Sequence, residues 1–371
     1  MRTESGFFKN IEIWRFILVM GVVLAHLHIC GFQQIGCHEI QHLCAVYWKK
    51  ASMSVSFFYI IAFFFLVLKT KPEQNFFSFI SSKWIRLAPL FIVITLLAWL
   101  LKKIGLLNVS FDLSAELEAD VLFVREFVAL KSFGQFNGAS WYCALYMLVA
   151  AFYYGLIKAL PPKAVPLTIG IITFFAWRGS LFLDINVSQG LAGTKRGLTA
   201  IANLGPAYLV CYAYTHYTAP QIISKLRTAV YTLAEVGITA IILSPVFMAK
   251  GIVSPFLVKI GFAWLLYSFI YRLGWISRLL ERDWCVFLGR YAYAIFATHF
   301  FVIYCIRDIF FAKYKEIALS HPYLTLAGIF TTMLIVGMLG HHLVEAPVMR
   351  YMKRRRAAAK AAEEAAPEAQ A

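Results

Sequence analysis

Charged residues are scarce in this 371-residue chain. Lysine, arginine, aspartate and glutamate make up 15% of it, whereas hydrophobic residues make up 61% and the mean hydropathy is +0.70. A soluble globular protein is excluded, because such proteins are usually about 25% charged. The apolar runs are long and are separated by short charged loops, which excludes a transmembrane β-barrel with its strands of about ten alternating residues. The composition therefore predicts an all-α polytopic membrane protein.

Acidic residues are the scarcer charged class, with 19 aspartates and glutamates against 35 lysines and arginines. The formal net charge of +16 is compatible with nucleic-acid binding in a soluble protein. In a membrane protein such an excess instead reflects cytoplasmic loops and contact with anionic lipids or anionic ligands. We therefore expect the lipid bilayer as a partner and no nucleic acid.

A standard metal site is also lacking. Residues 28–44 hold three histidines and three cysteines, but their spacing matches no known zinc site, so we expect no metal. Cys30, Cys37 and Cys44 fall at intervals of seven, which fits either one face of a helix or a disulfide in an oxidising compartment. Both interpretations stay open.

The apolar runs predict about ten transmembrane helices. They cover residues 11–31, 52–68, 87–101, 140–157, 164–182, 198–217, 230–249, 253–271, 286–306 and 323–341. With the N-terminus in the cytoplasm, ten spans return the C-terminus to the same side. Lysine and arginine are then more frequent in the cytoplasmic segments, as the positive-inside rule requires. The sequence predicts an integral, multi-pass protein of the cytoplasmic (inner) membrane.

Two segments lie outside this pattern. Residues 121–130, VLFVREFVAL, are apolar but contain an Arg–Glu pair, which favours an interfacial or re-entrant helix over a span. From residue 351 a basic stretch is followed by alanine-rich low-complexity sequence. The predicted division is therefore a membrane domain over residues 1–350 and a cytoplasmic tail over residues 351–371.

The first span carries ionisable residues that require an explanation. Arg15 and His26 are eleven residues apart, which places them on one helix face about 16 Å apart along the axis. His28 lies about 200° round the helix from His26. Ionisable groups cost about 2.5–3.5 kcal/mol at mid-membrane on insertion scales, so they usually face protein or a wet cavity. Taken alone, the pair fits equally well a functional site or a signal anchor with a snorkelling arginine.

Lys83 and Arg86, just before the third span, are neighbours on a helix. They fit either simple anchoring at the inner face or a clamp for a phosphorylated ligand, since lysine and arginine are the usual phosphate partners. Trp141, at the start of the fourth span, fits an interface anchor or a substrate platform.

The last two spans hold four further candidates. His299 lies in the ninth apolar run after Tyr291 and Tyr293. A single histidine on an apolar helix is more often structural than catalytic. Glu345 ends the last span, where pairing with nearby cations such as Arg350 is favoured over acid–base chemistry.

Together these segments resemble the type 3 acyltransferase family of integral membrane O-acyltransferases. The similarity covers about residues 7–350 in the family's order. It is carried by Arg15 and His26 with ten residues between them, and by the stretches SVSFFYIIAFFF, KWIRLAP, LGRYAYAIFATHF and VEAPVMR. Lys83 stands where the family has its first arginine, which keeps the charge but loses a bidentate fork. Ile61 and Ala62 stand where the family has Ser-Gly.

The resemblance implies transfer of an acyl group, with acetyl expected, from cytosolic acyl-CoA to a hydroxyl of a cell-surface or lipid-linked glycan. The acyl-CoA would be a co-substrate, and no tightly bound cofactor is expected. Lys83 and Arg86 would hold its phosphates, Arg15 would contact or orient the donor, and His26 would be the general base. Direct proton transfer by His26 and a covalent acyl-histidine both stay open.

The main alternative is a multi-span transporter or exporter without acyl-transfer chemistry. The spans contain few acids for ion coupling, Glu12 and Glu235, and no internal repeat is visible. A non-catalytic membrane partner that retains the fold is the third interpretation.

Overall fold

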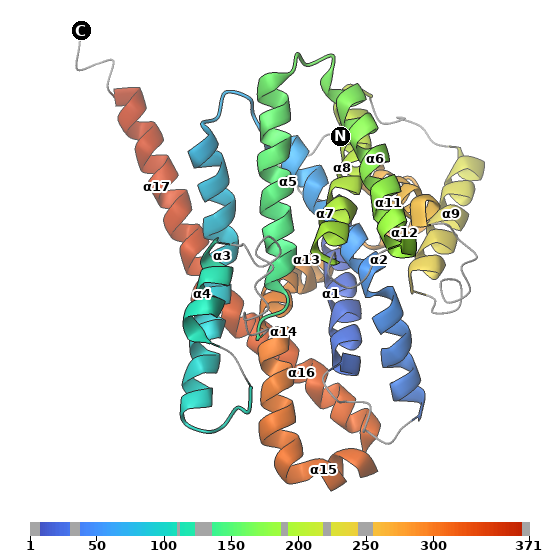
Figure 1. Cartoon of the computed structure of the whole chain (residues 1–371). Helices are drawn as coiled ribbons and strands as arrows, with labels where there is room; N and C mark the ends of the chain where they lie inside the picture. Colours follow the sequence, from blue (N-terminus) through green and yellow to red (C-terminus); the bar gives the residue numbers. More distant parts are fainter. Residues whose placement is uncertain are drawn as a thin grey trace.

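The computed structural model describes residues 8–29, 38–109, 112–122, 136–186, 192–217, 224–243 and 255–365 (Figure 1). Within these ranges every regular element is a helix and no strand occurs, which confirms the predicted all-α class. The elements are α1 (Lys9–Ile29), α2 (His38–Lys69), α3 (Phe76–Lys103), α4 (Leu113–Leu122), α5 (Ser140–Ala159), α6 (Val165–Asn186), α7 (Ala192–Ala202), α8 (Leu204–His216), α9 (Lys225–Leu243), α11 (Pro255–Tyr271), α12 (Trp275–Leu279), α13 (Asp283–Arg290), α14 (Ala292–Cys305), η3 (Ile306–Phe310), α15 (Phe311–Ser320), α16 (Pro322–Gly340), η4 (His341–Glu345) and α17 (Ala346–Ala365). The two η elements are π-helical turns.

Six helical segments in the described ranges are long and apolar enough to cross a membrane, and two shorter apolar helices accompany them. The six are Lys9–Leu27, Phe76–Lys103, Ser140–Ala159, Val165–Leu183, Ala292–Ser320 and Pro322–Arg355; the shorter two are Met53–Lys69 and Phe256–Tyr271. Each of the eight overlaps one predicted span. The chain is thus a helical protein with the apolar segments of an integral membrane protein.

Two predicted helices are interrupted in the structure. The run over residues 198–217 is divided at Asn203 into α7 and α8. Pro206 explains the break, because it lacks an N–H for a continuing helix and fits the first turn of a new one. The run over residues 286–306 is divided at Tyr291, so that α13 and α14 are separate helices.

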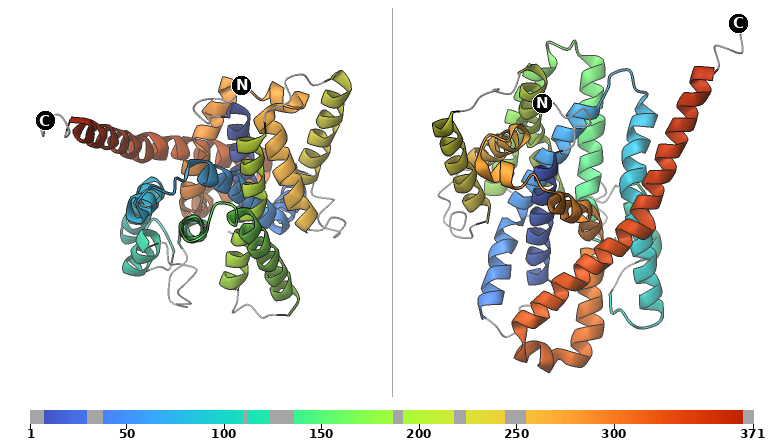
Figure 2. Two further views of the ribbon diagram at one scale, coloured as in Figure 1. Left: turned by 90° about the horizontal axis from the view of Figure 1, so that it is seen from above. Right: turned by 180° about the vertical axis from the view of Figure 1, so that it is seen from behind.

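Several predicted features fall partly outside the described residues. Helix α4 includes the beginning of the 121–130 segment, whereas residues 123–135 are not described. Cys44 is a buried free thiol in α2, and Cys30 and Cys37 lie outside the described residues. Helix α17 runs from Ala346 to Ala365, through the predicted boundary at residue 350, and extends away from the bundle (Figure 2).

Helix α1 is an interior helix. It packs against α2, α13, α14 and α11, and its Ile11, Trp14, Leu18 and Val22 are buried. This burial explains how a helix with a charged first turn fits the fold, because its ionisable residues face protein rather than lipid.

The start of α1 is fixed by polar contacts. The buried Asn10 side chain donates hydrogen bonds to the carbonyls of Phe269 and Ser277 at 2.8 and 2.9 Å. Lys9 Nζ donates to Asp283 at 2.7 Å, and this contact lowers the pKa of the Asp283 carboxyl. The Lys9–Asp283 pair is exposed and adds little stability. Asn10 therefore contributes most to fixing α1 against α11 and α12.

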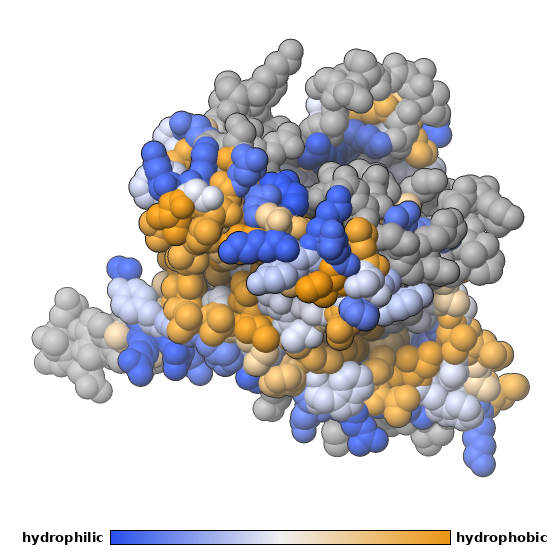
Figure 3. Space-filling view, turned by 90° about the horizontal axis from the view of Figure 1, so that it is seen from below, coloured by the Kyte–Doolittle hydropathy of each residue, from blue (hydrophilic) through white to orange (hydrophobic). Residues whose placement is uncertain are grey.

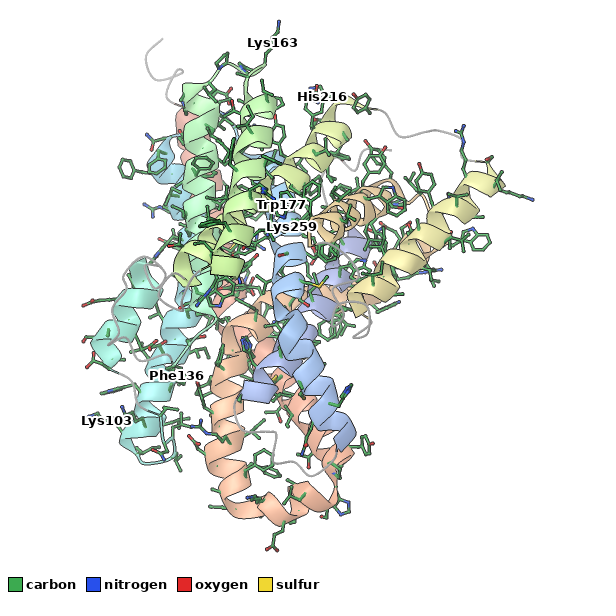
Figure 4. All side chains as sticks on the ribbon, turned by 45° about the vertical axis from the view of Figure 1, so that its right-hand side comes forward. Lys103, Phe136, Lys163, Trp177, His216 and Lys259 are labelled. Carbon is green, nitrogen blue, oxygen red and sulfur yellow. The ribbon has the colours of Figure 1, made fainter. Side chains whose placement is uncertain are left out.

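The two ends of the bundle are marked by basic residues. Lys163, between α5 and α6, and Lys103, at the end of α3, lie toward opposite ends of the molecule (Figure 4). The end face that carries α15 mixes hydrophilic and hydrophobic side chains (Figure 3), and Lys313, Lys315 and Glu316 are exposed there. Charged side chains at both ends are typical of a bundle whose ends leave the bilayer.

Gly289 allows α13 to lie directly on α1. A Cβ atom at this position would come within 2.4 Å of the Glu12 carbonyl oxygen. We expect Gly289→Ala to lower the free energy of unfolding by about 1–3 kcal/mol, because the two backbones must separate. Thermal unfolding of the detergent-purified protein measures the effect. Gly170→Ala is the matched control, since a Cβ there meets nothing within 4 Å; equal melting temperatures for the two variants would contradict the prediction.

Candidate active site

A cavity of about 480 Å³ lies where the five segments that carry the family resemblance converge. Its walls come from α1, α2, α3, α5, α13, α14 and η4. The lining residues are Glu12, Arg15, Phe58, Ile61, Ala62, Phe65, Leu66, Lys69, Lys83, Arg86, Leu87, Tyr142, Tyr146, Val286, Arg290, Tyr293, His341 and Glu345. Segments more than 300 residues apart in the chain thus form one site.

The cavity is strongly basic. Arg15, Lys69, Lys83, Arg86 and Arg290 line it, against only two carboxylates. Such a concentration of positive charge favours an anionic ligand, and arginine in particular suits phosphate through its fork of N–H donors.

Both carboxylates of the cavity are already engaged. Glu12 Oε2 lies 2.9 Å from Nη1 of Arg15, one turn along α1. Glu345 Oε2 lies 2.9 Å from Nδ1 of His341 across the π-helical turn η4. In the structure the partner of Glu345 is therefore His341. Both residues lie on a π-helical turn, a type of turn that often marks functional sites. The net charge of the cavity stays positive after these pairings.

Helix α3 positions Lys83 and Arg86. It starts at Phe76, eleven residues before the predicted span, because Asn75 Oδ1 accepts hydrogen bonds from the backbone N–H groups of Phe77 and Ser78. Lys83 and Arg86 are therefore inside the helix, one turn apart. Lys83 Nζ also lies 5.1 Å from the ring centroid of Phe79, a cation–π contact that limits its freedom.

His26 and His299 form a hydrogen-bonded pair. His299 Nε2 lies 2.8 Å from His26 Nδ1, and the ring centroids are 4.8 Å apart with the ring planes inclined by 23°. His299 is fully buried in α14, and its Nδ1 lies 2.6 Å from the backbone carbonyl of Phe296. The His26 ring also contacts Phe300 at 4.4 Å. A half-buried histidine is thereby held by a fully buried one.

An aromatic layer separates the basic cavity from the histidine pair. Phe58 and Tyr142 line the cavity, and both contact the ring of Phe296. Phe296 in turn contacts His299, with ring centroids 5.8 Å apart. The Tyr142 hydroxyl is buried and has no hydrogen-bond partner among the residues that the structure describes. The site therefore consists of a basic cavity, an aromatic layer with one unpartnered hydroxyl, and a histidine pair.

Comparison with known proteins identifies this architecture. Residues 8–341 match the family model of the type 3 acyltransferase domain. The chain belongs to the type 3 acyltransferase family. No curated protein and no solved structure matches it. The resemblance inferred from the sequence motifs is confirmed, and the protein is a membrane acyltransferase.

The remaining predicted residues of this acyltransferase have varied surroundings. Tyr293 lines the cavity and donates its hydroxyl to the Leu87 carbonyl. The Tyr291 hydroxyl lies 3.2 Å from Nε2 of His342. Trp141 is not among the cavity residues; the guanidinium of Arg196 lies 5.4 Å from its ring. Of these three aromatic residues, only Tyr293 joins Arg15, Lys83, Arg86 and Glu345 in the cavity.

Sequence reasoning gave no site role to four residues that line the cavity. Lys69 and Arg290 resembled boundary cations, Tyr142 resembled an interface anchor like its neighbour Trp141, and His341 had no distinguishing pattern. For Arg290 the sequence does give one indication of a site role. Arg290 follows Gly289, and a glycine within a helix can mark close packing that brings the neighbouring residue to a site. Within the described ranges, no cluster of three histidines, cysteines or acids is suited to a metal ion.

Proposed function

We propose that this protein is an O-acyltransferase of the cytoplasmic (inner) membrane. It moves an acyl group, with acetyl expected, from cytosolic acyl-CoA to a hydroxyl of a cell-surface or lipid-linked glycan. One observation carries the proposal: a basic cavity lies one aromatic layer away from a hydrogen-bonded histidine pair. The cavity suits the phosphates of the donor, and the histidine pair suits proton transfer from a hydroxyl.

The donor would bind at the Arg15 end of the site. Coenzyme A carries a pyrophosphate and a 3′-phosphate, and five basic side chains surround the cavity. Lys83 and Arg86 would bind these phosphates, with Lys69 and Arg290 adding charge from α2 and α13. Arg15, already held by Glu12, would orient the donor rather than act as a freely moving cation.

The acyl-carrying arm would extend from the cavity toward His26. The two ends of this path are Arg15 and His26, about 16 Å apart along α1. The arm would pass Tyr142, whose unpartnered hydroxyl is suited to donate to an amide or thioester carbonyl. The acyl group would then reach the histidine pair while the phosphates stay in the cavity.

His26 is the general base of the proposed reaction. It takes the proton from the acceptor hydroxyl as the oxygen attacks the thioester carbon. The carbon–sulfur bond then breaks, and the departing thiolate takes the proton back from His26 to give free coenzyme A. An unassisted sugar hydroxyl is a poor nucleophile at neutral pH, so the base supplies a large part of the rate.

The proposed orientation places both termini in the cytoplasm, with ten spans in between. The excess of lysine and arginine in the corresponding loops supports it. The Arg15 end of α1 and the basic cavity then open toward the cytosol, where acyl-CoA is found. His26 lies toward the outer leaflet, where a surface glycan is accessible.

A transfer assay tests this function. The purified protein, in lipid nanodiscs, is incubated with radiolabelled acetyl-CoA and a candidate lipid-linked or polymeric glycan. We expect covalent label on the glycan and stoichiometric release of coenzyme A. Comparing the acyl content of surface polysaccharide from cells with and without the protein identifies the acceptor. Acyl content that is identical in the two preparations, together with no label transfer to their glycans, would contradict the proposal.

A further inference from the structure

A chain of two hydrogen bonds connects His26 to the backbone of α14. His299 Nδ1 lies 2.6 Å from the Phe296 carbonyl oxygen, and His299 Nε2 lies 2.8 Å from His26 Nδ1. His299 has no exposed surface, so water does not compete for these nitrogens. The positions of the protons along this chain can therefore be assigned from the chemistry of the groups.

The assignment starts at the carbonyl. A carbonyl oxygen only accepts hydrogen bonds, so His299 Nδ1 must carry a proton. In a neutral imidazole the other nitrogen then carries a lone pair, and His299 Nε2 is an acceptor. The group that donates to it is His26 Nδ1–H. A neutral His26 with its proton on Nδ1 has its lone pair on Nε2.

The charged alternative is disfavoured by the surroundings. A doubly protonated His299 would place a positive charge in a fully buried site. The described ring neighbours of His299 are Phe296, Phe300 and His26, and its described hydrogen bonds include no carboxylate. An isolated charge in such surroundings carries a large desolvation cost, so the neutral arrangement is favoured.

We infer that His299 is a positioning residue that fixes the tautomer of His26. The inference rests on the proposed function, in which His26 is the base. His299 holds the His26 proton at Nδ1 and thereby keeps Nε2 free to accept the proton of the acceptor hydroxyl. When Nε2 is protonated, His26 becomes an imidazolium, and the Nδ1–H···Nε2 hydrogen bond to His299 becomes a stronger, charge-assisted one. Both ring nitrogens of His299 already take part in hydrogen bonds. His299 is therefore not the group that donates a hydrogen bond to the oxyanion formed when the hydroxyl attacks the thioester.

Two substitutions separate this role from simple packing. His299→Leu fills similar space but removes the acceptor, and we expect kcat for acyl transfer to fall about 100-fold. His299→Gln offers an amide oxygen to His26 Nδ1–H, and we expect a kcat within about 10-fold of the wild type. The KM for acyl-CoA should stay unchanged in both, because the basic cavity is untouched. His216→Leu, at an exposed histidine of α8, is the matched control and should leave kcat unchanged.

The tautomer itself can be measured without catalysis. Nitrogen-15 NMR of histidine-labelled wild-type protein in nanodiscs, with His26 assigned by its loss in His26→Gln, should show a protonated Nδ1 and an unprotonated Nε2. A His26 protonated at Nε2 would overturn the inference, as would wild-type kcat in His299→Leu. Failure of the proposed function looks different: the wild-type protein transfers no label, whereas the NMR readout still reports the tautomer. The NMR measurement also decides the matter if His299→Leu does not fold.

Discussion

Replacing His26 with alanine is expected to abolish acyl transfer while leaving the protein inserted in the membrane. The general base supplies a factor of about 10²–10⁴ in rate, and water cannot replace it at a position packed against Phe300 and His299. We expect kcat to fall about 100- to 10,000-fold, measured as label transferred from radiolabelled acetyl-CoA. Binding of coenzyme A should persist, because the basic cavity lies beyond the aromatic layer.

Two further variants make the His26 result specific. His26→Gln keeps most of the side-chain volume without providing a base, so it should be as inactive as His26→Ala. His28→Ala removes a histidine two residues along the same helix, about 200° away, and should cost little. Size-exclusion profiles and thermal unfolding show whether each variant is folded. Wild-type-like transfer by His26→Ala would contradict the role of His26 as base.

The architecture was largely predictable from local sequence pattern. Long apolar runs predicted the all-α class, and eight of the predicted spans overlap apolar helices of the structure. The shared face of Arg15 and His26 followed from their spacing along one helix. Such features are local, because helical periodicity and hydrophobic length are set by neighbouring residues. Helix breaks were less predictable, since the division at Tyr291 accompanies the close packing of α13 on α1 at Gly289.

The residues that line the cavity were predictable in part, but their contacts with one another were not. The motif order suggested that Arg15, Lys83 and Arg86 act together, and the structure places them around one cavity. Glu345, predicted to pair with cations such as Arg350, lines the same cavity. The contact of His26 with a residue 273 positions away depends on the packing of α1 against α14, which no local pattern specifies. Local pattern also does not show which buried hydroxyls find a hydrogen-bond partner. In the structure the hydroxyl of Tyr293 has one, the Leu87 carbonyl, whereas that of Tyr142 has none among the described residues.

The contacts of two buried acids bear on the transporter alternative. Glu12 is paired with Arg15. Glu235 accepts hydrogen bonds from the Ser268 hydroxyl and from the backbone N–H groups of Gly274 and Ser277. It thereby holds the start of α12 in place, as carboxylates at helix N-termini commonly do. An ion-coupling acid must exchange its partners during transport, so these engaged carboxylates favour the acyltransferase over an ion-coupled carrier.

Removing the two α3 cations that line the cavity, Lys83 and Arg86, should weaken donor binding strongly and leave the chemical step nearly intact. In Lys83→Ala/Arg86→Ala, two charge-assisted contacts with phosphate are lost, each contributing about 1.5 kcal/mol. Together they correspond to about a 100-fold higher KM for acyl-CoA. The kcat at saturating donor should change little, because the phosphates contribute the same binding energy to the ground state and the transition state.

The control for this double variant is taken from the same helix. Lys102→Ala/Lys103→Ala removes the same net charge from the last turn of α3, away from the cavity, and should leave KM unchanged. A donor that lacks the 3′-phosphate provides an independent comparison. If Lys83 and Arg86 bind that phosphate, its removal raises the KM of the wild type more than that of the double variant. The double variant already lacks the two side chains that contact the phosphate. An unchanged dependence on acyl-CoA concentration in Lys83→Ala/Arg86→Ala would show instead that the two cations only anchor α3 at the membrane surface.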